Sequence, residues 1–248
     1  MAAVRRDVAA IACTVAAYKP VLLLTAAEDA EGTKKACGGG IKVTDVPADD
    51  LWLRDYGPTF VIGPDGRPAG IDCGFNGWGG RQEHPRDGLV ARRVLGAFGV
   101  PRVGAPLVAE GGSLGTDGEG TLLVTESSLV NDNRNPGRSR DDIEKTLQKL
   151  LGIRKVIWLA GVRGEDITDC HVDALARFAA PGPVVLSNPP PGSSPTSGRG
   201  SSRPVRPWRR PRTRETGHRR SSNCPSPTPP SWATGAPTSW AAASTTTS

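Results

Sequence analysis

Three segments of the chain share one pattern: an acidic residue, a short strand, a tight turn and a second strand. They are DLWLRDYGPTFVIGPDGRPAGIDCGF at 50–75, EGGSLGTDGEGTLLVTE at 110–126 and EDITDCHVDALARFAAPGPVVLS at 165–187. Their PDGR, DGEG and APGP stretches are turn sequences, because glycine and proline provide the backbone conformations that tight turns require. The segments recur at intervals of roughly 55–60 residues, a repeat length typical of radial or stacked architectures. The pattern therefore predicts three hairpins around one axis, with their acidic starts together at the centre.

The sequence outside the hairpins alternates between helix and strand patterns. Helices are predicted at 86–98 and 139–151, each followed by a strand (VPRV and IRKVIWL). Before the first hairpin the expected elements are a helix, a strand, a second helix and a second strand, at 4–18, 20–25, 26–37 and 41–46. This alternation predicts an α/β fold. The N-terminal stretch has no long apolar core and no segment approaches transmembrane length, so we expect neither a signal peptide nor a membrane anchor.

The third hairpin segment places a histidine between two acids, as Asp169, His171 and Asp173. In an extended strand alternate side chains share a face, so we expect these three on one face and Cys170 on the other. Burying three titratable groups without a purpose is costly, and the cluster therefore indicates a functional site. The alternative is a solvent-exposed polar strand end that contains a histidine by chance.

The composition changes abruptly at Asn188. From there to the last residue the chain has 12 Pro and nine Arg but a single acid, Glu215, and it has no Leu, Ile, Phe or Met. Such a segment buries too little apolar surface to offset its chain entropy, so residues 1–187 are predicted to form the folded domain and residues 188–248 a disordered tail. Pro, Arg, Ser and Thr in these proportions are typical of a GC-rich gene read out of frame, and we interpret the tail as a frameshift product. The weaker alternative is a basic arm that binds nucleic acid without sequence preference.

Four motifs carry a family resemblance. DLWLRDYGPTFVI, IDCGFNGWGG, EGGSLGTDGEGTLLVTESSLVNDNRNP and DITDCHVDALARF, in this order, resemble the agmatine deiminases and bacterial-type peptidylarginine deiminases over about residues 3–187. The resemblance implies the pentein fold, an α/β propeller of five ββαβ modules, of which this chain would hold about three as an incomplete propeller. It also implies hydrolysis of a guanidinium group to a ureido group and ammonia, without a cofactor or metal. For agmatine the product is N-carbamoylputrescine, in putrescine and polyamine biosynthesis; the alternatives are citrullination of arginine-containing peptides, or a non-catalytic guanidinium-binding protein with a basic interaction tail.

The resemblance assigns roles to three residues. Asp55, in WLRDYGP, and Asp173, in HVD, match the two acids that bind the guanidinium group. Two carboxylates on different strands can each accept paired N–H bonds from this planar cation, which distinguishes it from a point-charge ammonium. His171 matches the histidine that gives a proton to the departing ammonia and then activates water.

Three further residues are candidate substrate contacts. Glu110, which opens EGG, matches an acid that binds the far end of the substrate or orients the site. Trp52 and Trp78 are candidate walls for the guanidinium face or the alkyl chain, and core packing is at least as good an interpretation of both. The asparagines of NDNRNP, at 131–135, are expected to pin a turn.

No cysteine in the sequence fits the family's nucleophile, which ends a glycine-rich segment near the C-terminus. Cys224 lies in SSNCPSPTPP without the electropositive surroundings that a reactive thiolate needs, and Cys170 should point away from His171. We therefore expect no nucleophile and an inactive chain. The five cysteines show no CxxC pair or metal spacing, and they predict free thiols in a reducing, cytoplasmic compartment. A small guanidinium compound or an arginine-containing peptide is the expected partner, and the intact protein can also form homo-oligomers.

Overall fold

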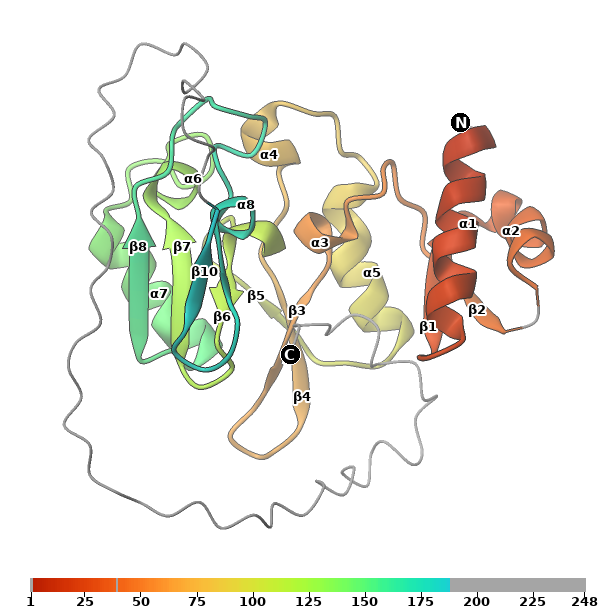
Figure 1. Cartoon of the computed structure of the whole chain (residues 1–248), viewed down its shortest axis with the longest axis horizontal. Helices are drawn as coiled ribbons and strands as arrows, with labels where there is room; N and C mark the ends of the chain where they lie inside the picture. Colours follow the sequence, from red (N-terminus) through yellow and green to blue (C-terminus); the bar gives the residue numbers. More distant parts are fainter. Residues whose placement is uncertain (1, 39, 188–248) are drawn as a thin grey trace. The chain divides into compact units, whose positions relative to one another are not determined.

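The computed structural model describes residues 2–38 and 40–187 (Figure 1). The tail at 188–248, for which we predict disorder, a frameshift origin or a basic arm, lies outside the described residues, as does Cys224. Within the described residues, no helix is both long and apolar enough to span a bilayer.

The first two hairpins belong to three-stranded sheets with the same topology. In each sheet the hairpin is followed by a helix and by a third strand that runs parallel to the second hairpin strand. The strands are β3 (Thr59–Ile62), β4 (Pro68–Asp72) and β5 (Arg102–Gly104) in the first sheet, and β6 (Gly115–Thr116), β7 (Thr121–Thr125) and β8 (Lys155–Leu159) in the second. The crossovers contain α5 (Val90–Ala97), preceded by the 3₁₀ turn η2 (Asp87–Leu89), and α7 (Arg140–Leu151). The predicted hairpins, helices and following strands are confirmed here, as two ββαβ units.

Partial units flank these two. Before them, β1 pairs in parallel with β2 across a helical crossover, and after them β9 and β10 form an antiparallel hairpin. These elements are α1 (Ala2–Ala16), β1 (Val21–Thr25), η1 (Ala27–Asp29), α2 (Ala30–Cys37), β2 (Ile41–Asp45), β9 (Ala176–Phe178) and β10 (Val184–Leu186). The helix expected at 26–37 is therefore divided into a 3₁₀ turn and an α-helix. None of the sheets formed by the described residues closes on itself.

The strand β7 is buried on both faces and organises the second sheet. On one face Leu122 and Val124 pack with Ile143 of α7. On the other face Leu123 packs with Val172. The continuous apolar run TLLVT is thus the expected pattern for a strand that is covered from two sides.

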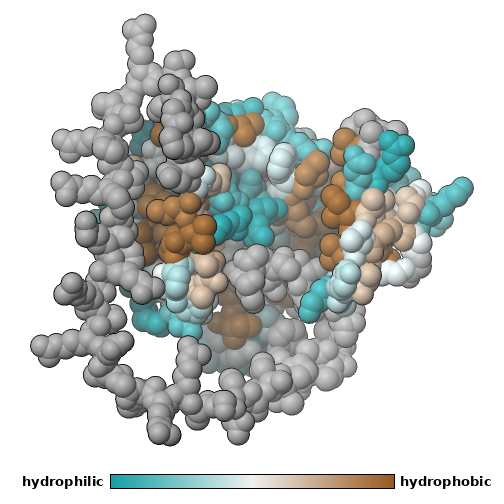
Figure 2. Space-filling model, viewed as in Figure 1, coloured by the Kyte–Doolittle hydropathy of each residue, from teal (hydrophilic) through white to brown (hydrophobic). Residues whose placement is uncertain are grey.

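Apolar side chains also remain at the surface of the described residues. Ile62 at the end of β3 is 65% exposed and Val185 in β10 is 61% exposed. Figure 2 shows brown apolar patches beside teal polar surface on one face of the molecule. Within the described residues each of these two strands, β3 and β10, pairs with a single neighbouring strand, so each is an edge strand with apolar surface beside it.

The helix α7 carries clear boundary signals. Ser139 Oγ accepts a hydrogen bond from the backbone N–H of Asp142, and the Asp142 carboxylate accepts one from the backbone N–H of Ser139. This reciprocal capping satisfies N–H groups that the first helical turn leaves unpaired. Gly152 ends the helix with a left-handed φ of 66°.

Each hairpin is preceded by a helical turn that carries an acid. The turns are α3 (Leu53–Tyr56), η3 (Gly111–Ser113) and α8 (Val172–Leu175). Asp55 lies within α3, Glu110 directly before η3 and Asp173 within α8. Both α3 and α8 pack against η3. Three segments that are distant in the sequence therefore bring their acids to one place.

The extended strand predicted around His171 is wrong. Asp169 and Cys170 have φ values of 60° and 68°, in the left-handed region, and His171 then leads into α8. The Asp169 carboxylate fixes this turn, because it accepts hydrogen bonds from Arg81 and Arg134 at 2.8 and 2.7 Å. Strand alternation could not predict this geometry, since both arginines are far away in the sequence.

Candidate active site

Gly112 marks the point where three of the predicted site residues meet. A Cβ atom built on it would lie 2.5 Å from His171 Nδ1, 2.7 Å from Asp55 Oδ1 and 3.0 Å from Asp173 Oδ2. Real Cβ atoms essentially never come within 3.0 Å of another atom, so a side chain here would displace His171 and Asp55 from their positions. The structure thus brings both predicted guanidinium-binding acids and the predicted proton-transfer histidine around one backbone position.

Asp55 is nearly buried, and both of its carboxylate oxygens are hydrogen-bonded. Gly112 N donates to Oδ1 and Trp78 Nε1 donates to Oδ2, each at 2.9 Å. Burial raises the pKa of Asp55 above its ordinary value, and the nearby His171 and the two hydrogen bonds oppose that rise only in part. The site therefore holds a desolvated carboxylate in a fixed orientation, an arrangement suited to a cationic ligand.

The two tryptophans predicted as substrate walls lie in different environments. Trp78, in the short helical turn α4 (Gly77–Gly80), is 2% exposed, and its ring meets Phe75 edge to face at 5.0 Å. Its indole N–H holds Asp55, so core packing and orientation of Asp55 are the roles that the geometry shows. Trp52 precedes α3 and is half exposed, so its side chain remains accessible to solvent.

His171 lies between two carboxylates. Its Nδ1 is 3.7 Å from Asp55 Oδ1, and its Nε2 is 3.4 Å from Glu110 Oε2. Neither Nε2 nor Glu110 Oε2 has a shorter polar partner among the described residues, although both atoms are buried. They face each other at 3.4 Å without the geometry of a hydrogen bond. A carboxylate oxygen only accepts, so a hydrogen bond between them requires the proton on Nε2 and leaves the lone pair of Nδ1 at the Gly112 side of the ring.

Asp173 is the more accessible of the two predicted guanidinium-binding acids. Its side chain is 26% exposed, and its Oδ2 lies 3.4 Å from Nη2 of Arg177. Arg177 is itself more than half exposed, so this ion pair is weak and exchangeable. A ligand guanidinium can therefore compete with Arg177 for the Asp173 carboxylate.

Glu110 is fully buried behind His171. Burial alone would raise the pKa of this carboxyl, but the hydrogen bond from His171 and the charge of Arg134 outweigh burial and hold its pKa below the ordinary value. Gly111 and Gly112, the next two residues, both lack room for a side chain, and a Cβ on Gly111 would overlap the carbonyl oxygen of Arg54. Of the two roles predicted for Glu110, the geometry accords with orientation of the site rather than contact with the far end of a substrate.

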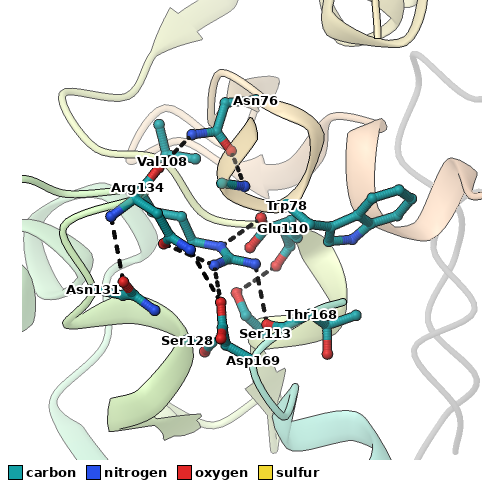
Figure 3. Close-up of polar contacts among 12 residues, drawn as sticks. Asn76, Trp78, Val108, Glu110, Ser113, Ser128, Asn131, Arg134, Thr168 and Asp169 are labelled. Atoms are coloured by element: carbon teal, nitrogen blue, oxygen red, sulfur yellow. Dashed lines mark hydrogen bonds and ion pairs between the residues drawn. The ribbon is translucent and has the colours of Figure 1, made fainter. Parts of the chain in front are cut away.

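Arg134 is a part of the site that the sequence analysis missed. Its side chain is fully buried, and its guanidinium lies between Glu110 and Asp169 (Figure 3). The predicted turn around it is confirmed, because the backbone N–H groups of Arg134 and Asn135 both donate to the carbonyl oxygen of Asn131, and the Asn131 side chain accepts from Asn133 N. No local pattern marks Arg134 as buried, since an arginine among asparagines is ordinarily a surface residue.

Asp169 belongs to the framework behind the site rather than to the site itself. It is fully buried, and burial alone would raise the pKa of its carboxyl. Hydrogen bonds from Gly164 N and from the guanidinium groups of Arg134 and Arg81 prevail and lower that pKa. The prediction that Asp169 shares a face with His171 is therefore wrong.

Two cysteines near the site, the partly buried Cys73 and the buried Cys170, keep their protons. Burial raises the pKa of Cys73 to about 12, helped by the negative charges of Asp72 and Glu110. Burial also raises the pKa of the Cys170 thiol. Neither thiol is thus poised as a nucleophile. Across the part of the chain that the structure describes, no group of three or more His, Cys, Asp or Glu is placed to hold a metal ion.

Comparisons with known proteins bear on this arrangement. Residues 1–201 match the sequence pattern of the Porphyromonas-type peptidyl-arginine deiminases. The chain is 41% identical over 186 residues to the agmatine deiminase of Pseudomonas aeruginosa (strain LESB58), covering 72% of this chain and 50% of that protein. It is 38% identical over 191 residues to the agmatine deiminase of Medicago truncatula, covering 71% and 51%. A solved structure of the agmatine deiminase of Enterococcus faecalis superposes with a TM-score of 0.70 at 33% identity, over 75% of this chain and 53% of that chain. This chain spans about half the length of the curated relatives it matches.

Proposed function

We propose that this chain, which belongs to the Porphyromonas-type peptidyl-arginine deiminase family, binds the guanidinium group of agmatine and carries the acid–base part of its hydrolysis. One observation carries the proposal: Asp55, Asp173 and His171 converge at Gly112. The substrate is chosen because the curated relatives are agmatine deiminases. The products of that reaction are a ureido compound, N-carbamoylputrescine, and ammonia.

The two aspartates recognise the guanidinium group by charge and by shape. Asp55 presents two oxygens whose orientation is fixed by Gly112 and Trp78, and each oxygen retains a lone pair for a ligand N–H. Asp173 approaches from α8 and is held by an exposed Arg177 that a ligand can displace. Two carboxylates on different elements bind a planar cation through several N–H groups at once, whereas an ammonium offers a single nitrogen.

His171 moves protons in the proposed reaction. With Nε2–H directed at Glu110, Nδ1 takes the proton of the attacking nucleophile and gives it to the departing ammonia. Nδ1 then takes a proton from the water that completes hydrolysis and returns it to the nucleophile as that group leaves. The carbon–nitrogen bond to the leaving ammonia breaks, and the water oxygen becomes the ureido oxygen. A covalent route also needs a thiolate, and burial keeps Cys73 and Cys170 protonated. We therefore propose that residues 2–38 and 40–187 alone bind agmatine without turning it over.

The architecture supports the same assignment. Two ββαβ units, a preceding β1–α2–β2 segment and a following β9–β10 hairpin fit an incomplete pentein propeller of about three modules. In a radial arrangement the helical turns before each hairpin face the axis. The meeting of α3 and α8 at η3 agrees with that geometry.

A peptide-bound arginine is the second candidate substrate, and the description of the matching family favours it. Agmatine and a peptidyl arginine present the same guanidinium group but differ in the groups attached to the other end of the alkyl chain. Binding of agmatine and of an N-acetylarginine amide to the same chain, measured side by side, separates the two candidates. Tighter binding of the amide would replace agmatine as the proposed substrate.

Exchanging either aspartate for asparagine is expected to weaken agmatine binding by the 248-residue chain. Each change removes the anion but keeps the size, so it should lose about 1.5–3 kcal/mol, which is roughly tenfold to more than a hundredfold in Kd. The losses in Asp55→Asn and Asp173→Asn should be non-additive, because both acids hold one planar group. Isothermal titration calorimetry measures both single variants and the double variant, with putrescine as the ligand that lacks a guanidinium.

The exposed turn residue Asp65 provides the matched control. Its side chain is about half exposed and pairs with Arg67, so Asp65→Asn should bind agmatine as the unchanged chain does. Unchanged binding in both Asp55→Asn and Asp173→Asn would contradict the proposed site. Equal binding of putrescine and agmatine would contradict guanidinium recognition.

As the pH is lowered, agmatine affinity is expected to begin falling at a higher pH than it would if Asp55 had the ordinary pKa of aspartate. The guanidinium keeps its charge, whereas Asp55 takes up a proton at a pH above its ordinary 3.8 because burial raises its pKa. Below that pH the affinity should fall about tenfold per pH unit, and Asp55→Asn should remove the dependence. Calorimetric titrations at successive pH values measure both slopes, and equal slopes in the two proteins would contradict the assignment.

The raised pKa of Asp55 and the lowered pKa of Glu110 make the free energy of unfolding change with pH in opposite directions. The native state binds the Asp55 proton more tightly than the unfolded state, so the contribution of Asp55 is present at low pH and is lost as the pH rises to its native pKa. Glu110 behaves in the reverse way, because its lowered pKa gives stability that is lost as the pH falls. A circular dichroism melt at each pH therefore separates loss of binding from acid unfolding.

A further inference from the structure

We infer that Arg134 is a positioning residue that acts on His171 through Glu110. The inference rests on the proposed function only for the proton-transfer role of His171. The rest of it comes from a chain of contacts between side chains. Alternating charges run from the partly exposed Arg81 through Asp169 and Arg134 to Glu110, which faces His171. Arg134 is the member that joins the framework to the site.

All three nitrogens of the Arg134 guanidinium donate hydrogen bonds to surrounding groups (Figure 3). Its Nε donates to Glu110 Oε1 at 2.7 Å. Its Nη1 donates to Asp169 Oδ2 at 2.7 Å and to Asn133 Oδ1 at 3.0 Å, and its Nη2 donates to the carbonyl oxygen of Thr168 at 3.1 Å. One carboxylate oxygen of Glu110 is thus taken by Arg134. The other oxygen, Oε2, is thereby directed at His171 Nε2.

The same guanidinium also fixes the backbone that leads into His171. Thr168 and Asp169 are held by Nη2 and Nη1, and Asp169 is in the left-handed conformation just before His171. A single planar fork therefore sets both the acceptor for Nε2 and the position of the ring. Lysine would keep the charge but offers one nitrogen, so it cannot reproduce these directions.

Arg134 also determines which charges surround the histidine. His171 faces Asp55 from α3, Glu110 before η3, Asp173 from α8 and, at longer range, Asp166. Arg134 is the cation that bonds directly to the most buried of these acids, Glu110, at a side chain that is fully excluded from solvent. Without it Glu110 would be an unpaired buried anion, and by taking up a proton it would become a donor to Nε2 instead of an acceptor. That change removes the arrangement of Nε2–H and an available Nδ1.

The test reads the protonated ring nitrogen of His171 directly in the 248-residue chain. The chain has three histidines, so ¹⁵N-histidine labelling gives three sets of ring signals, and His171→Gln assigns the relevant one. His84 is an internal reference, because its Nδ1 lies 2.9 Å from the carbonyl oxygen of Gln82 and must donate to it. The unchanged chain should show the opposite tautomer, Nε2–H, at His171.

Arg134→Lys is expected to lower the population ratio of the Nε2–H tautomer to the Nδ1–H tautomer at His171 about tenfold or more. This factor corresponds to the free energy of one hydrogen bond to a charged group. Arg81→Lys is the matched control: it removes the other guanidinium on Asp169 but leaves the bond from Arg134 to Glu110 in place, so it should lower Tm and change the His171 tautomer ratio much less than Arg134→Lys does. In a Glu110→Gln background the tautomer is already changed, and adding Arg134→Lys should have no further effect.

Three results would overturn the inference: unchanged His171 signals in Arg134→Lys, equal changes in Arg81→Lys, or additive changes in the Glu110→Gln background.

A measurement on the unchanged chain covers the case in which Arg134→Lys does not fold. The Nε proton of Arg134 and the Nε2 proton of His171 bind one buried carboxylate, so one opening should expose both to solvent. Protection factors, each taken relative to the intrinsic exchange rate of its own group, that differ by more than about tenfold would likewise overturn it.

Titration with agmatine keeps this inference separate from the proposed function. If agmatine leaves all His171 signals in place while the Arg134 effects appear as expected, the positioning role stands and guanidinium binding fails. If agmatine shifts the His171 signals but Arg134→Lys does not, guanidinium binding stands and the positioning role fails.

Discussion

Replacing Gly112 by alanine is expected to abolish measurable agmatine binding while leaving most of the fold intact. The added Cβ would lie 2.5 Å from His171 Nδ1, 2.7 Å from Asp55 Oδ1 and 3.0 Å from Asp173 Oδ2, so three groups of the site must move at once. Displacement of about 1 Å in a positioned site lowers performance about a hundredfold, and we expect at least that loss in affinity. The overpacking itself should reduce the free energy of unfolding by about 1–3 kcal/mol.

Gly115→Ala is the matched control for this change. Gly115 lies three residues further along, in β6, and a Cβ there would make ordinary contacts, the shortest 3.5 Å to Leu123. Calorimetry with agmatine and a thermal melt on both variants should show loss of binding in Gly112→Ala alone. Undiminished binding in Gly112→Ala would mean that the three side chains do not form one ligand site.

The elements that the sequence predicted correctly are those whose signals are local. The PDGR, DGEG and APGP turns gave the three hairpins, because glycine and proline restrict the backbone wherever they occur. The 139–151 helix was found because Ser139 and Gly152 mark its two ends. The repeat predicted that the acidic starts of the three hairpin segments meet at one centre, and the family resemblance supplied Asp55, Glu110 and Asp173 as the acids concerned. Neither argument depends on the type of turn that carries these residues.

The errors arise where long-range contacts decide the local structure. Asp169 and Cys170 read as strand residues, but the arginines that hold Asp169 in a left-handed turn are 88 and 35 residues away. The burial of Arg134 was not predicted for the same reason, because its partners Glu110 and Asp169 are distant from it in the sequence. Trp78 read equally well as a substrate wall or as core, and its hydrogen bond to Asp55 became visible only in three dimensions.

Replacing His171 by alanine is expected to reduce agmatine turnover about 10²–10⁴-fold once a nucleophile is supplied. A chimera provides one, by joining residues 1–187 to the C-terminal half of the agmatine deiminase of Pseudomonas aeruginosa, to which this chain is 41% identical over the part they share. KM should change little if Asp55 and Asp173 bind the guanidinium as proposed, whereas kcat should fall because no group would give a proton to ammonia. Release of N-carbamoylputrescine at varied agmatine concentration measures both constants.

The size of the loss in related variants then identifies what each residue contributes. His84→Ala is the control, since that ring bonds the carbonyl oxygen of Gln82 and faces none of the site residues at Gly112. Glu110→Gln keeps the histidine but loses the anion that holds Nε2–H, so its kcat should lie between those of the unchanged chimera and His171→Ala. Combining the two changes should give no more loss than His171→Ala alone, because Glu110 has nothing to orient once the ring is gone. A further loss in the double variant, or a kcat near that of the unchanged chimera in His171→Ala, would mean that the proton reaches ammonia by another path.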